Sequence, residues 1–340
     1  MRALVTGGTG FIGSHLIDEL LGQGYDVRVL RRHTSNITLL ENKKLSFVTG
    51  DLTDTESLER ACQQVDVVFH VAALPRDWGP KKTFFEVNFD GTQHLLDACV
   101  HNKVSRFVFM SSAAVYGFPK TQQPLTEEYR KNPTAKYGES KLCAEGLLWG
   151  YGMKHNITVT AIRSPVVTGP RDHLIALFLI KALQQGRLFY IGDGNQKISV
   201  SDGRDVAHCL RLAGESQKAN GQAYNVKSFD STPRQLIETL AERLQLPVPE
   251  KHRSYSWAYF LGGIIEGIWM LRGKENPPFT RHKVKVLGTP RLIDITKSTQ
   301  ELNYTPRYTY ATTIDDVVSW YRAFNQGPST ETRKSVRSTP

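Results

Sequence analysis

The apolar residues of this chain follow two spacings, and the alternation between them predicts a parallel sheet. Short apolar runs, such as residues 2–6, are typical of buried strands. Apolar residues three or four positions apart, such as Ile12, Leu16 and Leu20, are typical of helices. We expect strands near residues 2–6, 26–31, 45–48, 66–70, 105–111 and 157–162, and helices near residues 11–22, 55–64, 84–102 and 136–153. Strands that alternate with helices indicate the α/β class with a doubly wound parallel sheet.

The regular alternation weakens beyond about residue 165, where we expect a smaller lobe to begin. Residues 222–226 (Gln-Ala-Tyr-Asn-Val) have the pattern of a strand, and we expect this strand to return to the main sheet. We therefore assign residues 1–165 to the sheet domain and residues 166–325 to an interleaved C-terminal lobe. Residues 326–340 are rich in Ser, Thr, Pro and charge, a composition typical of a disordered tail.

A glycine-rich turn joins the first expected strand to the first expected helix. Gly7 permits the tight turn, Gly10 lets backbone amides approach a pyrophosphate, and Gly13 lets the helix pack closely on the strand. The N-terminus of the helix also favours a negative charge. The turn therefore predicts a dinucleotide phosphate site, formed by Gly7, Thr9, Gly10, Phe11, Ile12 and Gly13.

A second group of residues has the chemistry of proton transfer to a carbonyl oxygen. Tyr137 and Lys141 are four residues apart, so on a helix they share a face. A tyrosine phenol, with a pKa of about 10, is a poor base near neutral pH, and an ammonium beside it would stabilise the phenolate. Ser112, upstream, would donate a hydrogen bond to the substrate oxygen. With a nicotinamide cofactor in the glycine turn, these residues predict hydride transfer; a solvated helix face with a surface ion pair is the alternative.

Two arginines at the end of the second strand bear on the choice of cofactor. An acidic residue there would bind the ribose 2′-hydroxyl of NAD, whereas this chain has Arg31 and Arg32. A guanidinium pairs with a 2′-phosphate, which a carboxylate would repel. We therefore favour NADP over NAD. The alternative is that one arginine stacks on adenine or faces solvent while NAD is bound.

The composition agrees with a globular enzyme. The chain of 340 residues can bury a large core, and 40% of its residues are hydrophobic. Its four cysteines lack metal-site spacing, so we expect core thiols in a reducing compartment and no metal. Because the first strand begins at residue 2, we expect no signal peptide and a cytoplasmic protein. The net charge of +10 suits an anionic cofactor or an anionic membrane surface, and no nucleic-acid motif accompanies it.

The G-x-x-G-x-x-G spacing and the Tyr-x-x-x-Lys pair together resemble the short-chain dehydrogenase/reductase superfamily. The Ser-Ser-Ala-Ala-Val-Tyr-Gly segment at 111–117 resembles its extended branch, the NAD(P)-dependent epimerases and dehydratases. The likeness covers most of residues 1–325 and implies a Rossmann-type fold, a homodimer, and catalysis by Ser112, Tyr137 and Lys141. It also implies cofactor contacts from Asp51, Leu52, Val71, Ala72, Ala73, Asn88 (in an N-x-x-G-T motif), Ser111, Tyr137, Lys141, Ser164, Pro165 and Val167.

Comparison with that family narrows the substrate class. Ala113 and Ala114 stand where its sugar dehydratases carry acidic residues, so elimination of water has no obvious acid. The segment after the sixth strand lacks the asparagine with which nucleotide-sugar epimerases reach a diphosphate. Lys197 and Ile198 replace the usual Arg-Asp pair of those epimerases, although Lys197 and Arg204 could partly compensate. Nucleotide sugars are therefore disfavoured.

Other segments are similar to the 3β-hydroxysteroid dehydrogenase-like subgroup: residues 276–281, residues 320–322 and the loop at 70–79. That loop could place Leu74, Pro75 and Trp78 near a substrate, and Ala113 is a further candidate contact. The resemblance implies a bulky apolar substrate of sterol or lipid type.

Residues 255–271 form a stretch of 17 residues with a single charge, Glu266, flanked by Arg253, Arg272 and Lys274. The stretch is short for a membrane-spanning helix. Aromatic residues at both ends favour a peripheral membrane contact or a lid over an apolar pocket. A core helix of the C-terminal lobe is the alternative.

The sequence thus predicts an NAD(P)-dependent oxidoreductase that interconverts a secondary alcohol and a ketone, with Tyr137 as general acid or base and Ser112 as oxyanion donor. One alternative is a nucleotide-sugar 4-epimerase or reductase. Another is a non-catalytic NADP-binding redox regulator. The intact set of Ser112, Tyr137 and Lys141 counts against a regulator, because a sensor needs no proton donor.

Overall fold

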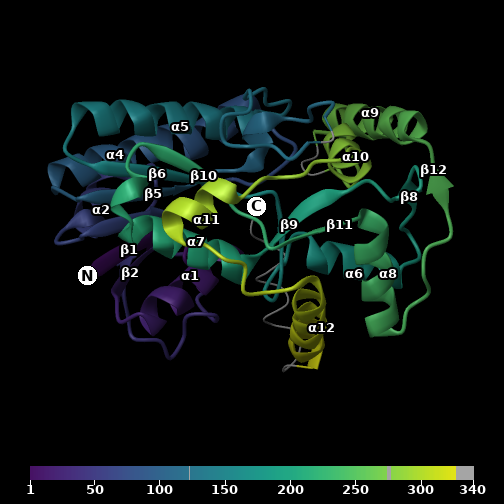
Figure 1. Ribbon diagram of the computed structural model, residues 1–340, viewed down its shortest axis with the longest axis horizontal. Helices are drawn as coiled ribbons and strands as arrows, with labels where there is room; N and C mark the ends of the chain where they lie inside the picture. Colours follow the sequence, from purple (N-terminus) through teal and green to yellow (C-terminus); the bar gives the residue numbers. More distant parts are fainter. Residues whose placement is uncertain (122, 274–276, 327–340) are drawn as a thin grey trace.

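The computed structural model describes residues 1–121, 123–273 and 277–326 (Figure 1). Its largest sheet has seven strands in the order β10-β6-β5-β4-β1-β2-β3, and all neighbouring pairs are parallel. The strands are β1 (Arg2–Thr6), β2 (Asp26–Arg31), β3 (Leu45–Thr49), β4 (Val67–His70), β5 (Arg106–Met110), β6 (Thr158–Arg163) and β10 (Gln222–Asn225). The predicted α/β fold is confirmed, and β10 is the strand expected at 222–226. The tail predicted to be disordered lies, from residue 327, outside the described residues.

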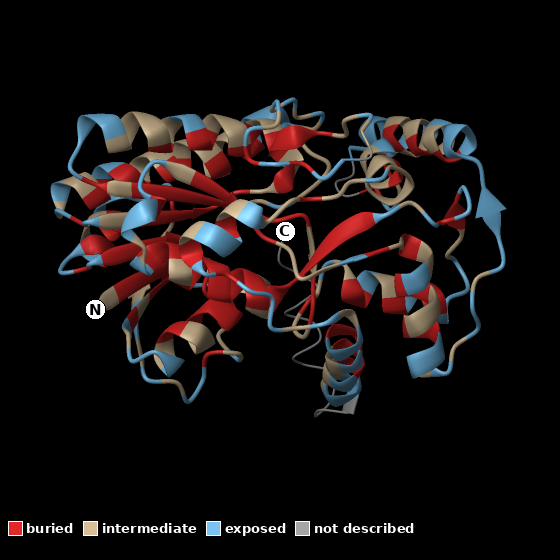
Figure 2. Ribbon diagram, in the orientation of Figure 1, coloured by how far each residue is buried: buried red, intermediate tan, exposed pale blue. Residues whose placement is uncertain are grey.

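Helices cover both faces of this sheet (Figure 1). On one face lie α1 (Phe11–Gly22), α7 (Gly203–Glu215) and α11 (Thr296–Leu302); on the other lie α2 (Thr55–Cys62), α4 (Gly91–His101) and α5 (Lys136–Lys154). Each strand supplies both cores, because successive side chains point to opposite faces. In β1, Ala3 and Val5 join the core under α1 and α7, whereas Leu4 joins the core under α2, α4 and α5. The strands are accordingly mostly buried, except for the edge strand β3, in which Ser46 and Phe47 are exposed (Figure 2).

The helix predicted at 84–102 is not one regular helix. The structure has α3 (Lys81–Phe85), a π-helical segment η1 (Glu86–Asp90), and then α4. A π-helical turn contains an extra residue, which changes the direction of the side chains on it and often marks a functional site. Here the wider turn carries Asn88, which is buried beside the candidate active site.

The C-terminal lobe is built around a small sheet with the order β11-β9-β7. Its strands are β7 (Val166–Thr168), β9 (Ile198–Asp202) and β11 (Phe229–Ser231), and a separate pair joins β8 (Tyr190–Ile191) to β12 (His252–Arg253). The remaining helices are α6 (Ala176–Gln184), α8 (Pro233–Leu244), α9 (Tyr255–Leu271), α10 (Arg281–Gly288) and α12 (Tyr310–Gln326), with 3₁₀ turns η2 (Ala113–Tyr116) and η3 (Gln217–Ala219). In the described part of the chain, no helix is both long enough and apolar enough to cross a bilayer.

Candidate active site

The glycine turn between β1 and α1 has the geometry of a phosphate cradle. The amide of Gly10 donates to the carbonyl oxygen of Gly7 at 3.0 Å, and Gly7 has a φ of 71°. A Cβ atom on Gly13 would lie 2.1 Å from that oxygen, and one on Gly7 would lie 2.6 Å from the backbone nitrogen of Ala72. No side chain caps the N-terminus of α1, so its first backbone amides can bind an anion. These residues therefore fit the pyrophosphate of a dinucleotide.

The fold brings the other predicted cofactor residues to the same edge of the sheet. The carboxyl ends of parallel strands meet at one edge, where ligands bind in open α/β sheets. Arg31 and Arg32 lie at the end of β2, Asp51 and Leu52 after β3, Val71, Ala72 and Ala73 after β4, Ser111 after β5, Ser164 and Pro165 after β6, and Val167 in β7. The strand order changes direction between β1 and β4, next to the glycine turn. That these residues, from Arg31 to Val167, contact a cofactor remains a prediction.

A buried histidine fixes the centre of this edge. The ring of His70 is hydrogen-bonded to the hydroxyls of Thr6 at 2.7 Å and Thr92 at 3.0 Å. Burial lowers the pKa of His70 to about 3, so the imidazole is neutral. Thr6 also accepts the backbone amide of Ala72 at 3.3 Å. His70 thus ties β1, β4 and α4 together beneath the loop that carries Ala72.

Arg31 and Arg32 take part in no ion pair within the described residues. The guanidinium of Arg31 lies over the ring of Phe47, 5.5 Å from its centroid, and its buried Nε has no hydrogen-bond partner there. Buried polar groups are usually paired, so an unpaired guanidinium nitrogen beside a ligand edge fits an anion.

Ser112 and Tyr137 are brought together across β5 and α5. Burial raises the pKa of Tyr137 to about 12, and a hydrogen bond with Ser112 acts in the opposite direction. The Ser112 hydroxyl also accepts the amide of Ala114 at 3.1 Å, as the cap of η2. At neutral pH Tyr137 therefore holds its proton and can give it to a carbonyl oxygen.

Lys141 lies one helical turn further along α5 and is 1% exposed. Its ammonium donates to the carbonyl oxygen of Met110 at 2.8 Å and lies 4.4 Å from the ring centroid of Phe109. Burial lowers the pKa of Lys141 to about 7, whereas the charge of Glu145 raises it. The side chain is therefore directed to the end of β5, at the edge where the cofactor is predicted.

A buried ion pair lies beneath these residues. Both oxygens of Glu145 accept from Arg163, at 2.9 Å from Nε and 2.6 Å from Nη2, and Ser111 donates to Glu145 at 2.5 Å. Arg163 also donates to the hydroxyl of Tyr116 at 3.0 Å. Sequence reasoning missed this network. Two signals in the sequence could have indicated it: Glu145 follows Lys141 by one turn, and Arg163 is the only charge in a strand that is otherwise uncharged.

Asn88 organises the site from the π-helical segment. Its side chain accepts the backbone amide of Leu74 at 2.8 Å and donates to the hydroxyl of Ser140 at 3.0 Å. Ser140 in turn donates to the backbone oxygen of Tyr137 at 2.8 Å. Asn88 thus holds the loop after β4 against the helix that carries Tyr137.

The predicted substrate contacts fall in two different environments. Leu74 and Trp78 line a cavity of about 60 Å³ at the loop after β4, and Pro75 is exposed in the same loop. Ala113 is fully buried, and its amide donates to the carbonyl oxygen of Ser164 at 2.8 Å. Ligand sites are commonly several hundred Å³, so a bulky substrate would require this loop to open.

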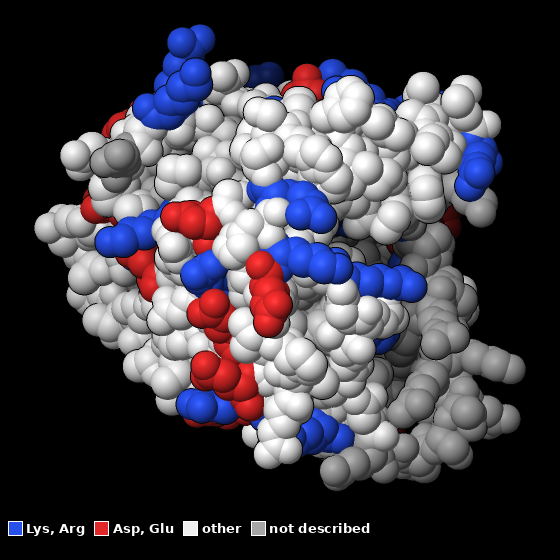
Figure 3. All heavy atoms as spheres, turned by 90° about the vertical axis from the view of Figure 1, so that its right-hand side faces the viewer, with Lys and Arg blue, Asp and Glu red and all other residues white. Residues whose placement is uncertain are grey.

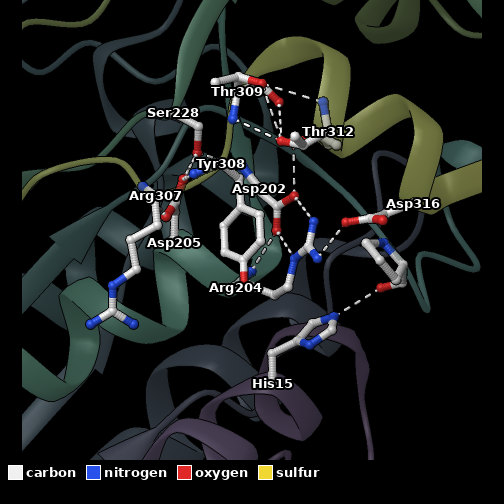
Figure 4. Close-up of polar contacts among 12 residues, drawn as sticks. His15, Asp202, Arg204, Asp205, Ser228, Arg307, Tyr308, Thr309, Thr312 and Asp316 are labelled. Atoms are coloured by element: carbon white, nitrogen blue, oxygen red, sulfur yellow. Dashed lines mark hydrogen bonds and ion pairs between the residues drawn. The ribbon is translucent and has the colours of Figure 1, made fainter.

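Arg204 is held in place by its own lobe (Figure 4). Its guanidinium is paired with Asp202 and Asp316, each at 2.7 Å, and lies 3.6 Å from the ring centroid of Tyr308. It borders a larger cavity of about 350 Å³ between α1 and the C-terminal lobe, lined also by His15. Arg204 is therefore already neutralised and is not free to replace the missing diphosphate contact.

Fold and site together define an enzyme class, an oxidoreductase built on an NAD(P)-binding Rossmann fold. The sequence model of the NAD dependent epimerase/dehydratase family matches residues 3–226. The chain belongs to this family, the extended short-chain dehydrogenases/reductases.

Two curated relatives cover nearly the whole chain. It is 29% identical over 321 residues to the 2-alkyl-3-oxoalkanoate reductase of Stenotrophomonas maltophilia, covering 90% of this chain and 95% of the relative. It is 29% identical over 329 residues to the decarboxylating sterol-4-alpha-carboxylate 3-dehydrogenase of Mus musculus, covering 93% of this chain and 90% of the relative. Among solved structures, UDP-glucuronic acid 4-epimerase from Bacillus cereus in complex with NAD is similar with a TM-score of 0.78 and 25% identity, covering 96% of this chain and 100% of that one.

Proposed function

We propose that this protein interconverts a secondary alcohol and a ketone on a bulky apolar substrate, with a nicotinamide cofactor supplying or accepting the hydride when bound. The observation that carries the proposal is that Ser112 lies close enough to Tyr137 to oppose the effect of burial on its pKa, at the edge of the sheet where the glycine turn lies. Ser112 would hold the carbonyl oxygen, and Tyr137 would give it a proton. Lys141 would stabilise the tyrosine after it has lost that proton.

The names of the two relatives share a chemical pattern that narrows the substrate further. In a 2-alkyl-3-oxoalkanoate and in a sterol 4-carboxylate with an oxygen at position 3, the reacting carbon is β to a carboxylate on an apolar body. We infer the same pattern here, a 3-oxo or 3-hydroxy acid with an apolar scaffold.

Arg291 is our candidate for the carboxylate of such a substrate. Its guanidinium lies 5.0 Å from the ring centroid of Phe118, just beyond the turn that begins at Ser112. No ion pair neutralises it within the described residues, and burial lowers its pKa to about 10. Arg291 is half-buried and therefore only partly hydrated, and a carboxylate would satisfy its guanidinium with two parallel hydrogen bonds.

NADP is the cofactor that we favour, because the unpaired Nε of Arg31 suits the 2′-phosphate. Comparing kcat/KM for NADPH and NADH tests this. Arg31→Ala should reduce the value for NADPH at least about tenfold and leave that for NADH nearly unchanged. Equal losses with both cofactors would contradict the assignment.

Turnover on defined ketones tests the reaction. A 2-alkyl-3-oxoalkanoate should be reduced faster than its methyl ester, and Arg291→Met should remove that difference. Tyr137→Phe should bind the cofactor normally and lose at least about a thousandfold in kcat, as expected for a proton donor. Unchanged turnover in Tyr137→Phe would refute the mechanism.

A nucleotide-sugar 4-epimerase is the second candidate, because the similar Bacillus cereus structure is such an epimerase. The pairing of Arg204 with Asp202 and Asp316 counts against it. A tightly retained NAD after purification, with conversion of a UDP-sugar, would favour the epimerase. A protein that binds NADPH yet turns over neither ketones nor sugars would instead be the redox regulator.

A further inference from the structure

Helix α9 is fixed to the protein by one face only. Ala258, Gly262 and Glu266, which share that face, are its buried residues. A Cβ on Gly262 would lie 2.9 Å from the backbone nitrogen of Arg281, so the helix packs tightly on the start of α10. Glu266 accepts from the amide of Arg281 at 2.8 Å and from its Nε at 2.6 Å. The only charge within α9 is thus paired on the inner face.

The opposite face of α9 is an exposed apolar stripe. It consists of Trp257, Phe260, Ile264, Ile268 and Leu271, which are 45%, 70%, 44%, 38% and 86% exposed. Their separations of three and four residues place them in one line along the helix, with no polar residue among them. Seven of the thirteen large apolar side chains that are exposed in the described structure belong to this helix, so the exposure is concentrated and not scattered.

Basic residues stand at both ends of the stripe. Lys251 and Arg253 precede it and Arg272 follows it, and all three are exposed. The guanidinium of Arg253 lies 5.2 Å from the ring centroid of Trp257. Glu250, beside Lys251, is the one exposed acid next to these residues in the described sequence. Figure 3 faces this end of the molecule, where Lys and Arg side chains border a broad uncharged area.

This charge pattern distinguishes between two possible occupants of the stripe. In a symmetric dimer, each copy would present the same patch to the other. The basic ends would then meet basic ends, because α9 exposes no acid that could pair with them. A bilayer with anionic lipids would instead bury the apolar side chains and attract the basic ends.

We propose that α9 is an in-plane helix that docks the protein on an anionic membrane surface. Its inner face stays on α10 while the stripe from Trp257 to Leu271 enters the boundary between headgroups and acyl chains. Trp257 lies at one end of the stripe, beside Arg253, an arrangement suited to the headgroup level.

The docked helix would lie close to the loop that carries Trp78. Thr280, the cap of α10, donates to Asp77 in that loop at 2.6 Å. An apolar substrate could then pass from the bilayer toward Leu74 and Trp78. This consequence rests on the proposed function, whereas membrane binding itself does not.

Vesicle flotation of the full chain tests the proposal, with phosphatidylcholine vesicles that either contain or lack phosphatidylserine. We expect the wild-type protein to float with the anionic vesicles and more weakly with the neutral ones. Phe260→Gln/Leu271→Gln should bind at least about tenfold more weakly to both, because two exposed apolar anchors are lost. Arg253→Gln/Arg272→Gln should lose about tenfold on anionic vesicles alone. Met153→Gln, which changes an exposed apolar residue on α5, is the matched control and should bind like the wild type.

Two results would overturn the proposal. The first is a wild-type protein that floats with neither vesicle. The second is a lipid-free dimer, seen by sedimentation velocity, that Phe260→Gln/Leu271→Gln dissociates, because a second copy would then cover the stripe. Since no step of the assay uses turnover, failure of the membrane proposal is separable from failure of the proposed reaction.

Discussion

The buried ammonium of Lys141 should destabilise the folded protein, and Lys141→Met tests this directly. The variant removes the charge and keeps most of the side-chain length. Lys141 is 1% exposed, and burial lowers its pKa from 10.5 to about 7. The unfolded chain therefore binds this proton more tightly than the native protein does. Because one pKa unit corresponds to about 1.4 kcal/mol, the penalty below neutral pH is about 4 to 5 kcal/mol.

This penalty has a defined pH window. Between about pH 7 and 10.5 the native state has released the proton while the unfolded state still holds it, so wild-type stability rises with pH. Lys141→Met lacks the group, and its stability advantage should therefore shrink by about 2 kcal/mol between pH 7 and 9. Lys141→Met also loses the hydrogen bond to Met110 and the contact with Phe109. These losses change the free energy of unfolding by the same amount at every pH, so they do not alter how the difference between the two proteins depends on pH.

Urea denaturation of the cofactor-free protein at several pH values within this window measures the slope. Lys154→Met, at the exposed end of the same helix, is the control and should differ from the wild type by the same amount at every pH. Lys141→Met should also lose turnover, because no ammonium remains beside Tyr137. A pH-independent difference between Lys141→Met and the wild type would refute the reasoning, since the lysine would then carry the same charge in both states.

Two further substitutions test the ion pair and the glycine turn. Glu145→Gln leaves the guanidinium of Arg163, which is 3% exposed, without its counter-charge and should cost about 3 kcal/mol in urea denaturation at neutral pH; a loss below about 1 kcal/mol would contradict a buried ion pair. Gly13→Ala should weaken NADPH binding at least about tenfold in a fluorescence titration, because its Cβ would lie 2.1 Å from the carbonyl oxygen of Gly7. Gly22→Ala, at the far end of α1 where a Cβ meets nothing within 4 Å, should bind NADPH normally.

Features that depend on local spacing were predictable from the sequence. Most strands of the central sheet are short apolar runs, so their positions follow from the pattern of apolar residues along the sequence. The glycine turn and the Tyr137–Lys141 pair each lie within one element or one tight turn, where neighbours in sequence are neighbours in space. Ser112 and Tyr137 come from different elements, so no local spacing places them together, and their pairing was predicted from their chemistry and from the family resemblance.

Features that depend on distant segments were not predictable in the same way. Arg163 of β6 meets Glu145 because α5 packs on β6, and Arg291 meets Phe118 because the chain returns from the C-terminal lobe to the active-site edge. The spacing of residues along the sequence does not predict such contacts between different elements. The π-helical turn around Asn88 was also not predicted, because a single wider turn leaves the apolar spacing of the flanking helices almost unchanged.

The position of Glu145 explains how α5 can hold a charge so deep in the protein. Tyr137, Lys141 and Glu145 are spaced by one turn each, and the charge of Glu145 opposes the effect of burial on the pKa of Lys141. Arg163 pairs with Glu145 at 2.6 Å and supplies the counter-charge of that carboxylate in the core. In Glu145→Gln the pKa of Lys141 should consequently fall below about 7, and the rise of stability with pH should begin at a lower pH than in the wild type.

The same shift should be visible in the kinetics if reduction requires the Lys141 ammonium. The pH at which kcat/KM decreases should then move down by the same amount, since kcat/KM reports the groups of the free enzyme. Agreement between the two shifts would identify Lys141 as the titrating group in both measurements, and a shift in stability without one in kcat/KM would separate the buried charge from the reaction.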